Sequence, residues 1–204
     1  MPKIFKQMST NFILYKPCGV LSQLYSNDPK EKKKNFLGAL YDFPEGIMPV
    51  GRLDMKSEGL LLMTTDGKLS DRINRSGIEK EYYAQVDGII TDKDIEEMRQ
   101  GVDIGLSGRI YRTAPCEVQL IKAQPFLPAP DPMLRIGRHR PTSWMSITLK
   151  EGKYRQVRKM TAAVGFPTLR LVRVRIGKLK LASMKPGDIQ ELDALDIQAL
   201  QIID

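Results

Sequence analysis

An arginine and an aspartate stand two positions apart in the segment Gly51-Arg52-Leu53-Asp54, shortly before the apolar run 59–65. Glycines at positions 51 and 59 bound this segment, which is typical of a loop. A single carboxylate beside a cation, with no cluster of metal-ligating residues nearby, favours covalent or acid–base chemistry. We therefore expect Asp54 to be the reacting residue and an anionic polymer such as RNA to be the substrate.

Several other chemistries lack the residues they need. The chain has one histidine, His139, and two cysteines, Cys18 and Cys116, which lie far apart and form no C-x-x-C pair. A zinc site or a Ser–His triad is therefore not expected, and we predict no metal. Neither the glycine-rich phosphate loop nor the G-x-G-x-x-G pattern is present, so we also predict no nucleotide cofactor. Aspartate, tyrosine and arginine remain as the chemical groups.

Composition indicates a globular protein with an anionic partner. The chain has 204 residues, of which 42% are hydrophobic, and a formal net charge of +8. Such a basic excess favours nucleic acid or a membrane surface. No long basic amphipathic helix with a strongly apolar face is evident, so nucleic acid is preferred. The N-terminus carries no apolar stretch of signal-peptide length, and we expect a cytoplasmic protein without a membrane span.

Two further segments supply tyrosine and cations. Lys80-Glu81-Tyr82-Tyr83 begins a predicted strand. In 151–160, Arg155, Arg158 and Lys159 have the i, i+3, i+4 spacing that gathers side chains on one face of a helix. That basic face lies opposite an apolar stripe, and spacing alone leaves open whether it contacts a ligand or only solvent.

Apolar periodicity predicts the elements that must position these side chains. Thr91 is a predicted helix N-cap, and a change of apolar parity at Gly177 predicts a bend or bulge. Strands outnumber helices and do not alternate with them regularly, which favours an α+β fold with a largely antiparallel sheet. The predicted strands are 11–15, 59–65, 79–86, 114–120, 144–150 and 169–181, and the predicted helices are 68–75, 91–100 and 156–164.

Two polar segments separate these elements. The run 27–34 is rich in lysine, and charge blocks of this kind are usually solvated loops. The segment 124–141 has five prolines and the cations Arg135, Arg138, His139 and Arg140. It is too long for a simple connection, so RNA contact and a merely solvated insertion both stay open.

Taken together, the three chemistry-bearing segments resemble the pseudouridine synthases, in the branch that modifies ribosomal RNA (the RsuA/RluB/RluE/RluF group). The family's Gly-Arg-Leu-Asp loop matches 51–54, its Lys-x-Tyr strand matches 80–82, and its Glu-Gly helix motif with a basic pair matches 151–160. The family's opening Lys-Pro-x-Gly resembles 16–19, and its late Arg-Leu-x-Arg strand resembles 170–173. Five segments in order, spread over 11–193, make the resemblance specific.

The resemblance implies an enzyme that isomerises a particular uridine of 23S ribosomal RNA to pseudouridine, without a cofactor. It implies that Asp54 is catalytic, as nucleophile or as base, that Arg158 pairs with it, and that Tyr82 faces the uracil. Leu171 would pack under Tyr82, and Arg52 would handle the flipped nucleotide. The rival hypothesis is a non-catalytic, basic RNA-binding or ribosome-assembly factor on the same fold.

The resemblance also implies a pseudouridine synthase-like catalytic domain with a mostly antiparallel mixed sheet flanked by helices and loops. We expect a monomer with one catalytic domain at 11–193, short tails at 1–10 and 194–204, and no S4 RNA-binding domain, as in the RluE-type members. Ribosomal RNA, free or in an assembling subunit, would be the partner. The expected RNA-contacting residues are Arg52, Leu171, Lys16, Arg155, Lys159, Arg170, Arg173, Arg138 and Arg140.

Overall fold

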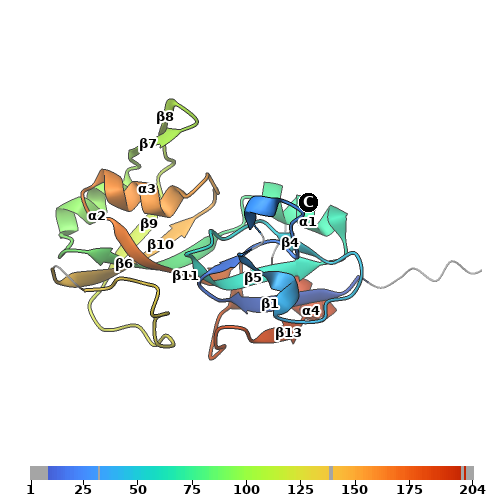
Figure 1. Ribbon diagram of the computed structural model, residues 1–204. Coiled ribbons are helices and arrows are strands. Elements are labelled where there is room, and N and C mark those ends of the chain that lie inside the picture. The colour runs from blue at the N-terminus through green and yellow to red at the C-terminus, as the bar shows by residue number, and fades with distance from the viewer. Residues whose placement is uncertain (1–8, 32, 138–139, 199, 201–204) are drawn as a thin grey trace, which may run out of the picture.

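A nine-stranded sheet forms the centre of the computed structural model, which describes residues 9–31, 33–137, 140–198 and 200. Its strands are β1 (Asn11–Lys16), β4 (Met48–Val50), β5 (Glu58–Thr64), β6 (Lys80–Asp87), β9 (Glu117–Ile121), β10 (Thr142–Leu149), β11 (Thr168–Ile176), β12 (Leu179–Lys180) and β13 (Ile189–Glu191). The order is β13-β1-β5-β11-β6-β10-β9, with β4 beside β5 and β12 beside β11 (Figure 1). β5 and β11 are parallel, and the other pairs of this sheet are antiparallel. The predicted α+β class with a mostly antiparallel mixed sheet is confirmed.

The remaining elements flank this sheet. Two small sheets pair β2 (Val20–Leu21) with β3 (Asn35–Phe36) and β7 (Asp103–Leu106) with β8 (Arg109–Arg112). The helices are α1 (Gly67–Arg75), α2 (Asp92–Arg99), α3 (Gln156–Ala163) and α4 (Ala194–Gln198), with short 3-10 turns at Pro29–Glu31 and Leu37–Ala39. In the described part of the chain, none of the helices has the length and apolar character of a membrane span.

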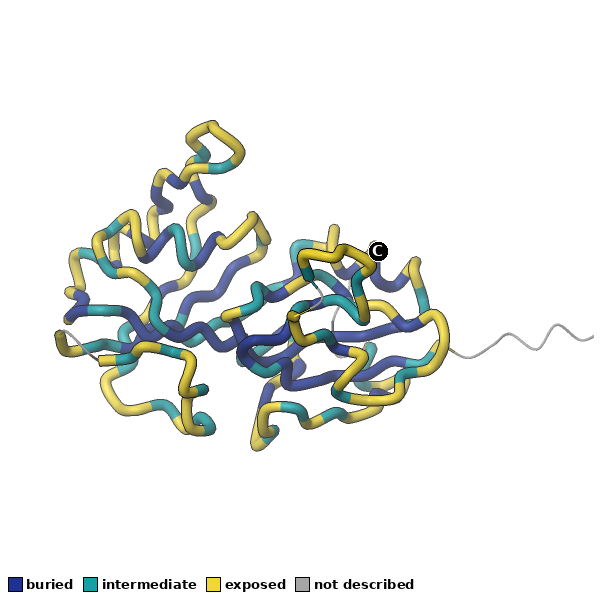
Figure 2. The backbone as a smooth tube through the Cα atoms, viewed as in Figure 1, coloured by how far each residue is buried: buried dark blue, intermediate teal, exposed yellow. Residues whose placement is uncertain are grey.

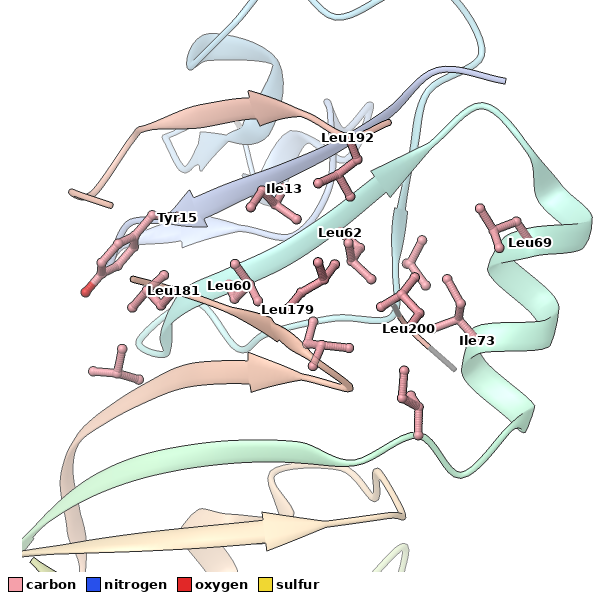
Figure 3. Close-up of a cluster of buried hydrophobic side chains, with 14 residues drawn as sticks. Ile13, Tyr15, Leu60, Leu62, Leu69, Ile73, Leu179, Leu181, Leu192 and Leu200 are labelled. Atoms are coloured by element: carbon pink, nitrogen blue, oxygen red, sulfur yellow. The ribbon is translucent and has the colours of Figure 1, made fainter. Parts of the chain in front are cut away.

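The sheet has two halves that meet where β5 lies beside β11 (Figure 1). In the first half, every residue of β1 and β5 is buried (Figure 2). Because side chains alternate along a strand, Leu60 and Leu62 face α1, while Leu61 and Met63 enter a second cluster on the other side. Figure 3 shows the first cluster, to which Leu69 of α1 also belongs. Packing on both faces explains why β5 is a continuous apolar run in the sequence.

In the second half, α2 and α3 cover one face of β6, β9 and β10 (Figure 1). Ala84 and Met145 from paired strands pack there with Met98 of α2 and Met160 of α3. The opposite face of these strands is polar, because the residues that alternate with the core positions include Glu81 and Ser146. This arrangement places α3, with its basic face, against β11, which lies beside β5 in the middle of the sheet.

Local signals predicted several boundaries correctly. Thr91 caps α2 through a capping box with Asp94, as its sequence position indicated. The bend predicted at Gly177 is a hairpin turn between β11 and β12, with φ 54°. A Cβ at this glycine would lie 2.9 Å from Ile78 and from the Leu200 carbonyl oxygen, so the bend also needs a residue without a side chain.

Other boundaries differ from the predictions. The strand predicted at 114–120 begins at Glu117, because the amides of Ala114 and Cys116 donate to Glu151 and to Arg99 instead of to a neighbouring strand. The β7–β8 hairpin was not predicted; Ser107 and Gly108 form its turn with positive φ at both positions, as two-residue hairpins favour. Within the stretch expected to be a C-terminal tail, Ile197 of α4 packs against the first core cluster and Leu200 is fully buried in it.

The proline-rich segment 122–141 crosses the face of the sheet opposite α2 and α3 (Figure 1). Leu127 packs against the cluster around β1 and β5, and Arg140 forms an ion pair with Asp87 at 3.0 Å. The segment is therefore attached to both halves of the sheet. Two of its cations, Arg138 and His139, lie outside the described residues.

A substitution at Gly59 tests how closely β5 and β11 pack where the two halves of the sheet meet. A Cβ there would lie 2.7 Å from the Arg173 backbone nitrogen and closer still to its carbonyl oxygen, at φ 102°. We expect Gly59→Ala to lower the unfolding free energy by about 3 kcal/mol or more, since overpacking and backbone strain combine. Urea unfolding followed by circular dichroism measures this change. Gly105→Ala is the matched control, because its Cβ would meet no atom within 4 Å; equal losses in both variants would contradict the tight junction.

Candidate active site

Asp54 lies in the loop between β4 and β5, and its backbone is held on both sides. The hydroxyl of buried Ser22 donates to the Leu53 carbonyl oxygen at 2.8 Å and accepts from the Leu53 amide at 3.0 Å. On the other side, the amide of Gly19 donates to the Met55 carbonyl oxygen at 2.8 Å. The segment that follows β1 therefore fixes the position of the aspartate.

Lys16 supports the same loop from inside the protein. Its side chain is fully buried, and its ammonium donates to the carbonyl oxygens of Pro17 at 2.9 Å, Val20 at 2.6 Å and Met55 at 3.5 Å. Burial lowers the pKa of Lys16 to about 8. Lys16, expected as an RNA contact, has no exposed surface here, and its ammonium with three carbonyl partners holds the turn together.

Two arginines from the start of α3 face the carboxylate of Asp54. Arg155 Nη1 lies 3.5 Å and Arg158 Nε 4.0 Å from Asp54 Oδ2, and the side chain of Asp54 is 23% exposed. The sequence resemblance implied the Arg158 pair; Arg155, expected as an RNA contact, is the nearer of the two. Both guanidinium groups are close enough for charge-assisted attraction to an aspartate carboxylate.

Arg158 is also tied to the loop that carries Asp54. Its Nη2 donates to the Lys56 carbonyl oxygen at 2.9 Å, and its Nη1 donates to the Thr168 carbonyl oxygen at 3.1 Å. Burial, followed by repulsion from Arg155, lowers the pKa of Arg158, and attraction to Asp54 opposes this change. The guanidinium thus links α3, β11 and the loop that carries Asp54.

The nearer arginine depends on an unusual backbone conformation. Arg155 precedes α3 with φ 53° and ψ 35°, in the left-handed region that L-residues rarely adopt. Hydrogen bonds between Lys153 and Gln156 close this turn in both directions. Glu151 then accepts from Gln156 Nε2 at 2.5 Å and from the Tyr111 hydroxyl at 2.6 Å. These contacts over-determine the turn, which is how strained backbone persists at functional sites.

Tyr82 and Leu171 lie in the same cleft as Asp54. The two side chains share one face of paired strands β6 and β11 and pack in the second-half core cluster. The cleft has a volume of about 70 Å³, and Asp54, Tyr82 and Leu171 line it together with Arg52 and Arg155. The structure thus brings together the implied catalytic aspartate, the tyrosine and the leucine, with exposed Arg52 at the mouth.

Arg170 is part of a buried ion pair. Its side chain and that of Glu58 are each 2% exposed, with Nε donating to Glu58 Oε1 at 2.8 Å and Nη2 to Oε2 at 3.1 Å. The Tyr15 hydroxyl donates to the same carboxylate at 2.9 Å, and burial together with Glu58 raises the pKa of Tyr15. Arg170, expected as an RNA contact, is thus buried and has its bidentate partner inside the protein.

Arg173, another expected RNA contact, is buried as well. Its Nε donates to the Leu60 carbonyl oxygen at 2.7 Å, and its guanidinium carbon lies 6.0 Å from the centroid of the Tyr82 ring. Its side chain is thus packed behind Tyr82. Strand alternation predicts exposure on one face of a sheet, and β11 has core on both faces where it passes between the two halves.

The remaining predicted cations lie at different places. Lys159 follows Arg158 on α3, and its ammonium donates to the Gly105 carbonyl oxygen of β7 at 2.6 Å. Arg140 is exposed and pairs with Asp87, the last residue of β6. Arg138 lies outside the described residues. Of the expected RNA-contacting cations, Arg52 and Arg155 line the cleft.

Sequence reasoning missed Ser22 and Glu151 as supports of the site. Glu151 stands directly before Gly152, shortly ahead of the predicted helix 156–164. An acidic residue near a helix N-terminus is a signal that its carboxylate interacts with that end of the helix. Ser22 carries no such signal, because its partner Leu53 is distant in sequence. Within the described residues, no three His, Cys, Asp or Glu side chains are grouped to hold a metal ion.

A larger hollow, of about 600 Å³, lies on the opposite face of the sheet. Glu81, Tyr83 and Arg175 line it together with the start of the proline-rich segment. These β6 positions alternate with Tyr82, so the hollow opens away from Asp54. The smaller cleft is the candidate active site, because it holds the groups capable of the chemistry.

The buried Lys16 makes stability depend on pH. With its pKa lowered to about 8 from 10.5, the unfolded chain binds a proton that the folded chain releases between these values, so unfolding free energy rises with pH. From the linkage relation, we expect the unfolding free energy of wild type, minus that of Lys16→Met, to rise by roughly 2 kcal/mol between about pH 7.5 and about pH 10. Urea unfolding at both pH values measures it, and a constant difference would contradict a buried titrating ammonium.

Comparison with known proteins agrees with this geometry. The family described as RNA pseudouridylate synthase matches residues 11–163. A protein of Xanthomonas campestris named ribosomal large subunit pseudouridine synthase E is 41% identical over 184 residues, covering 89% of this chain and 95% of that protein. A protein of the same name from Vibrio parahaemolyticus is 36% identical, covering 94% of this chain and 77% of that protein.

A solved structure titled "Crystal structure of pseudouridylate synthase" has the same fold, with a TM-score of 0.75 at 24% identity, covering 96% of this chain and 75% of that chain. The human RNA pseudouridylate synthase domain containing 1 is more distant, with a TM-score of 0.51, 16% identity and coverage of 90% and 78%. At these identities the structures support the fold, while the family match and the relatives settle membership. The chain belongs to the RNA pseudouridylate synthase family.

Proposed function

We propose that this chain isomerises a specific uridine of 23S, large-subunit ribosomal RNA to pseudouridine, with Asp54 as the reacting group. The observation that carries the proposal is the carboxylate of Asp54 facing Arg155 and Arg158 in a cleft that also contains Tyr82. Membership of the pseudouridylate synthase family and relatives named as large-subunit synthases support the reaction and the RNA.

The reaction rearranges bonds without a redox step. The N1–C1′ bond breaks, the uracil rotates, C5 joins C1′, and the proton of C5 leaves while N1 gains one. An ionised Asp54 serves this sequence either as a nucleophile or as a base that deprotonates the sugar. Both roles need a carboxylate at the position where Asp54 faces Arg155 and Arg158.

Tyr82 is suited to hold the uracil during its rotation. Its ring lies against Leu171 in the cleft, with the Arg173 guanidinium behind it. A ring fixed in this way offers a stacking surface, and its hydroxyl is a candidate carrier for the C5 proton.

The uridine must leave its stack to reach Asp54, at a cost of a few kcal/mol. The flipped nucleotide would enter the cleft that Arg52, Asp54 and Tyr82 line together. Arg52 is exposed at the mouth of this cleft and is therefore suited to bind the phosphate of the flipped nucleotide or to fill its place in the stack.

The finer parts of the proposal concern the setting of the enzyme. We propose a monomer that acts in the cytoplasm through one catalytic domain, with ribosomal RNA as its partner and no cofactor. The net charge of +8 supports binding to RNA phosphates, whose strength falls steeply with salt.

Replacing the reacting carboxylate should abolish the reaction. We expect Asp54→Asn to reduce isomerisation of 23S rRNA by at least about 10⁴-fold, as removal of a reacting group typically does, while RNA affinity stays within a few-fold. Tritium release from rRNA labelled with [5-³H]uridine measures the rate, and filter binding measures affinity. Turnover within tenfold of wild type would refute the catalytic role and favour a non-catalytic RNA-binding protein.

Removing the arginine that joins the loop to α3 should slow the reaction by a smaller factor. We expect Arg158→Met to reduce kcat about 10²- to 10³-fold, because a preorganised charge is lost. Arg158→Lys should recover part of the rate, since it keeps the charge without the planar fork. The same tritium assay measures kcat of both variants, with circular dichroism as the folding control. An unchanged kcat in Arg158→Met would contradict a role for Arg158 in the reaction.

A further inference from the structure

Tyr154 is an exposed aromatic side chain beside the candidate active site. It is 72% exposed, although it stands one residue before Arg155, which contacts Asp54. Its neighbours Lys153 and Arg155 both line the cleft, so the tyrosine lies at the rim. Tyr154 belongs to none of the three hydrophobic core clusters of the described residues.

The backbone that carries Tyr154 is fixed. The Lys153 amide donates to Gln156 Oε1 at 2.9 Å, and the Gln156 amide donates to the Lys153 carbonyl oxygen at 3.1 Å. Glu151 anchors the same turn to the β7–β8 hairpin through the Tyr111 hydroxyl. A ring on such a turn loses little conformational freedom when a ligand binds, which favours affinity.

One side of the ring meets a cation that is itself held in place. The Lys159 ammonium lies 5.1 Å from the ring centroid and donates to the Gly105 carbonyl oxygen at 2.6 Å. Lys153 and Arg155 add two further exposed cations in the same turn. A rigid aromatic surface surrounded by positive charge is the combination that binds single-stranded RNA, where bases stack and phosphates are neutralised.

We propose that Tyr154 stacks on an unpaired base adjacent to the target uridine and thereby contributes to the choice of substrate. The inference rests on the proposed function, and it concerns a different nucleotide from the one that enters the cleft beside Tyr82. Lys153, Arg155 and Lys159 are placed to contact the phosphates around that base. Tyr154 is a specificity residue and takes no part in bond making.

The experiment measures kcat and KM for tritium release from an in vitro transcript of 23S rRNA labelled with [5-³H]uridine. Because stacking on one base typically accounts for about 1–3 kcal/mol, we expect Tyr154→Ala to raise KM roughly 10- to 100-fold with kcat within about threefold of wild type. Tyr154→Phe should behave as wild type, and Tyr154→Leu should behave as Tyr154→Ala, because the aromatic face rather than apolar volume is required. Phe126→Ala is the matched control, since Phe126 is 95% exposed and borders the hollow on the opposite face of the sheet.

A second measurement separates stacking from a structural role. In Tyr154→Trp, the added indole should retain activity and its fluorescence should be quenched when the transcript binds. The inference is overturned if Tyr154→Ala leaves KM unchanged, if Tyr154→Leu equals wild type, or if kcat falls without a change in KM.

Failure of the proposed function gives a different result. A wild-type protein that binds the transcript but releases no tritium refutes the isomerase assignment, and quenching in Tyr154→Trp then still decides whether the ring stacks on RNA. Wild-type protein that does not bind the transcript refutes both proposals.

Discussion

The buried ion pair between Glu58 and Arg170 is the contact on which the site depends. It lies where β5 and β11 run side by side, and Tyr15 from β1 donates to the same carboxylate. Two buried charges are tolerated because they are paired in bidentate geometry; removing one partner of such a pair typically costs about 3–5 kcal/mol. The pair joins the half of the sheet that carries Asp54 to the half that carries Tyr82, so the relative position of these two groups follows from it.

The cations of this basic chain therefore divide into two groups. Lys16, Arg170 and Arg173 are buried and hold backbone carbonyls or a carboxylate, whereas Arg52 and Arg155 line the cleft and Lys159 contacts Gly105 of β7. A net charge of +8 describes the whole molecule and does not tell which cations face RNA. Burial decides this, because a charge without exposed surface is paired inside the protein.

The turn before α3 brings several of these features together. It places Arg155 against Asp54 by means of a left-handed residue, and it presents Tyr154 to solvent. The supports of this turn come from distant parts of the chain, including Tyr111 of the β7–β8 hairpin and Gly105, the partner of Lys159. The hairpin thus supports the turn that carries Arg155, although its residues do not line the cleft.

The sequence by itself determined the class of fold, the elements of the core and the family. Apolar alternation predicted the central strands, Thr91 predicted a helix start, and the order of five segments indicated the family. Tertiary structure alone decided which cations are buried, that Arg155 lies nearer to Asp54 than Arg158, and that Ile197 and Leu200 pack on the core. The physical reason is distance along the chain: periodicity and capping act over a few residues, whereas the contact between Glu58 and Arg170 spans 112 positions and exists only once the strands are ordered.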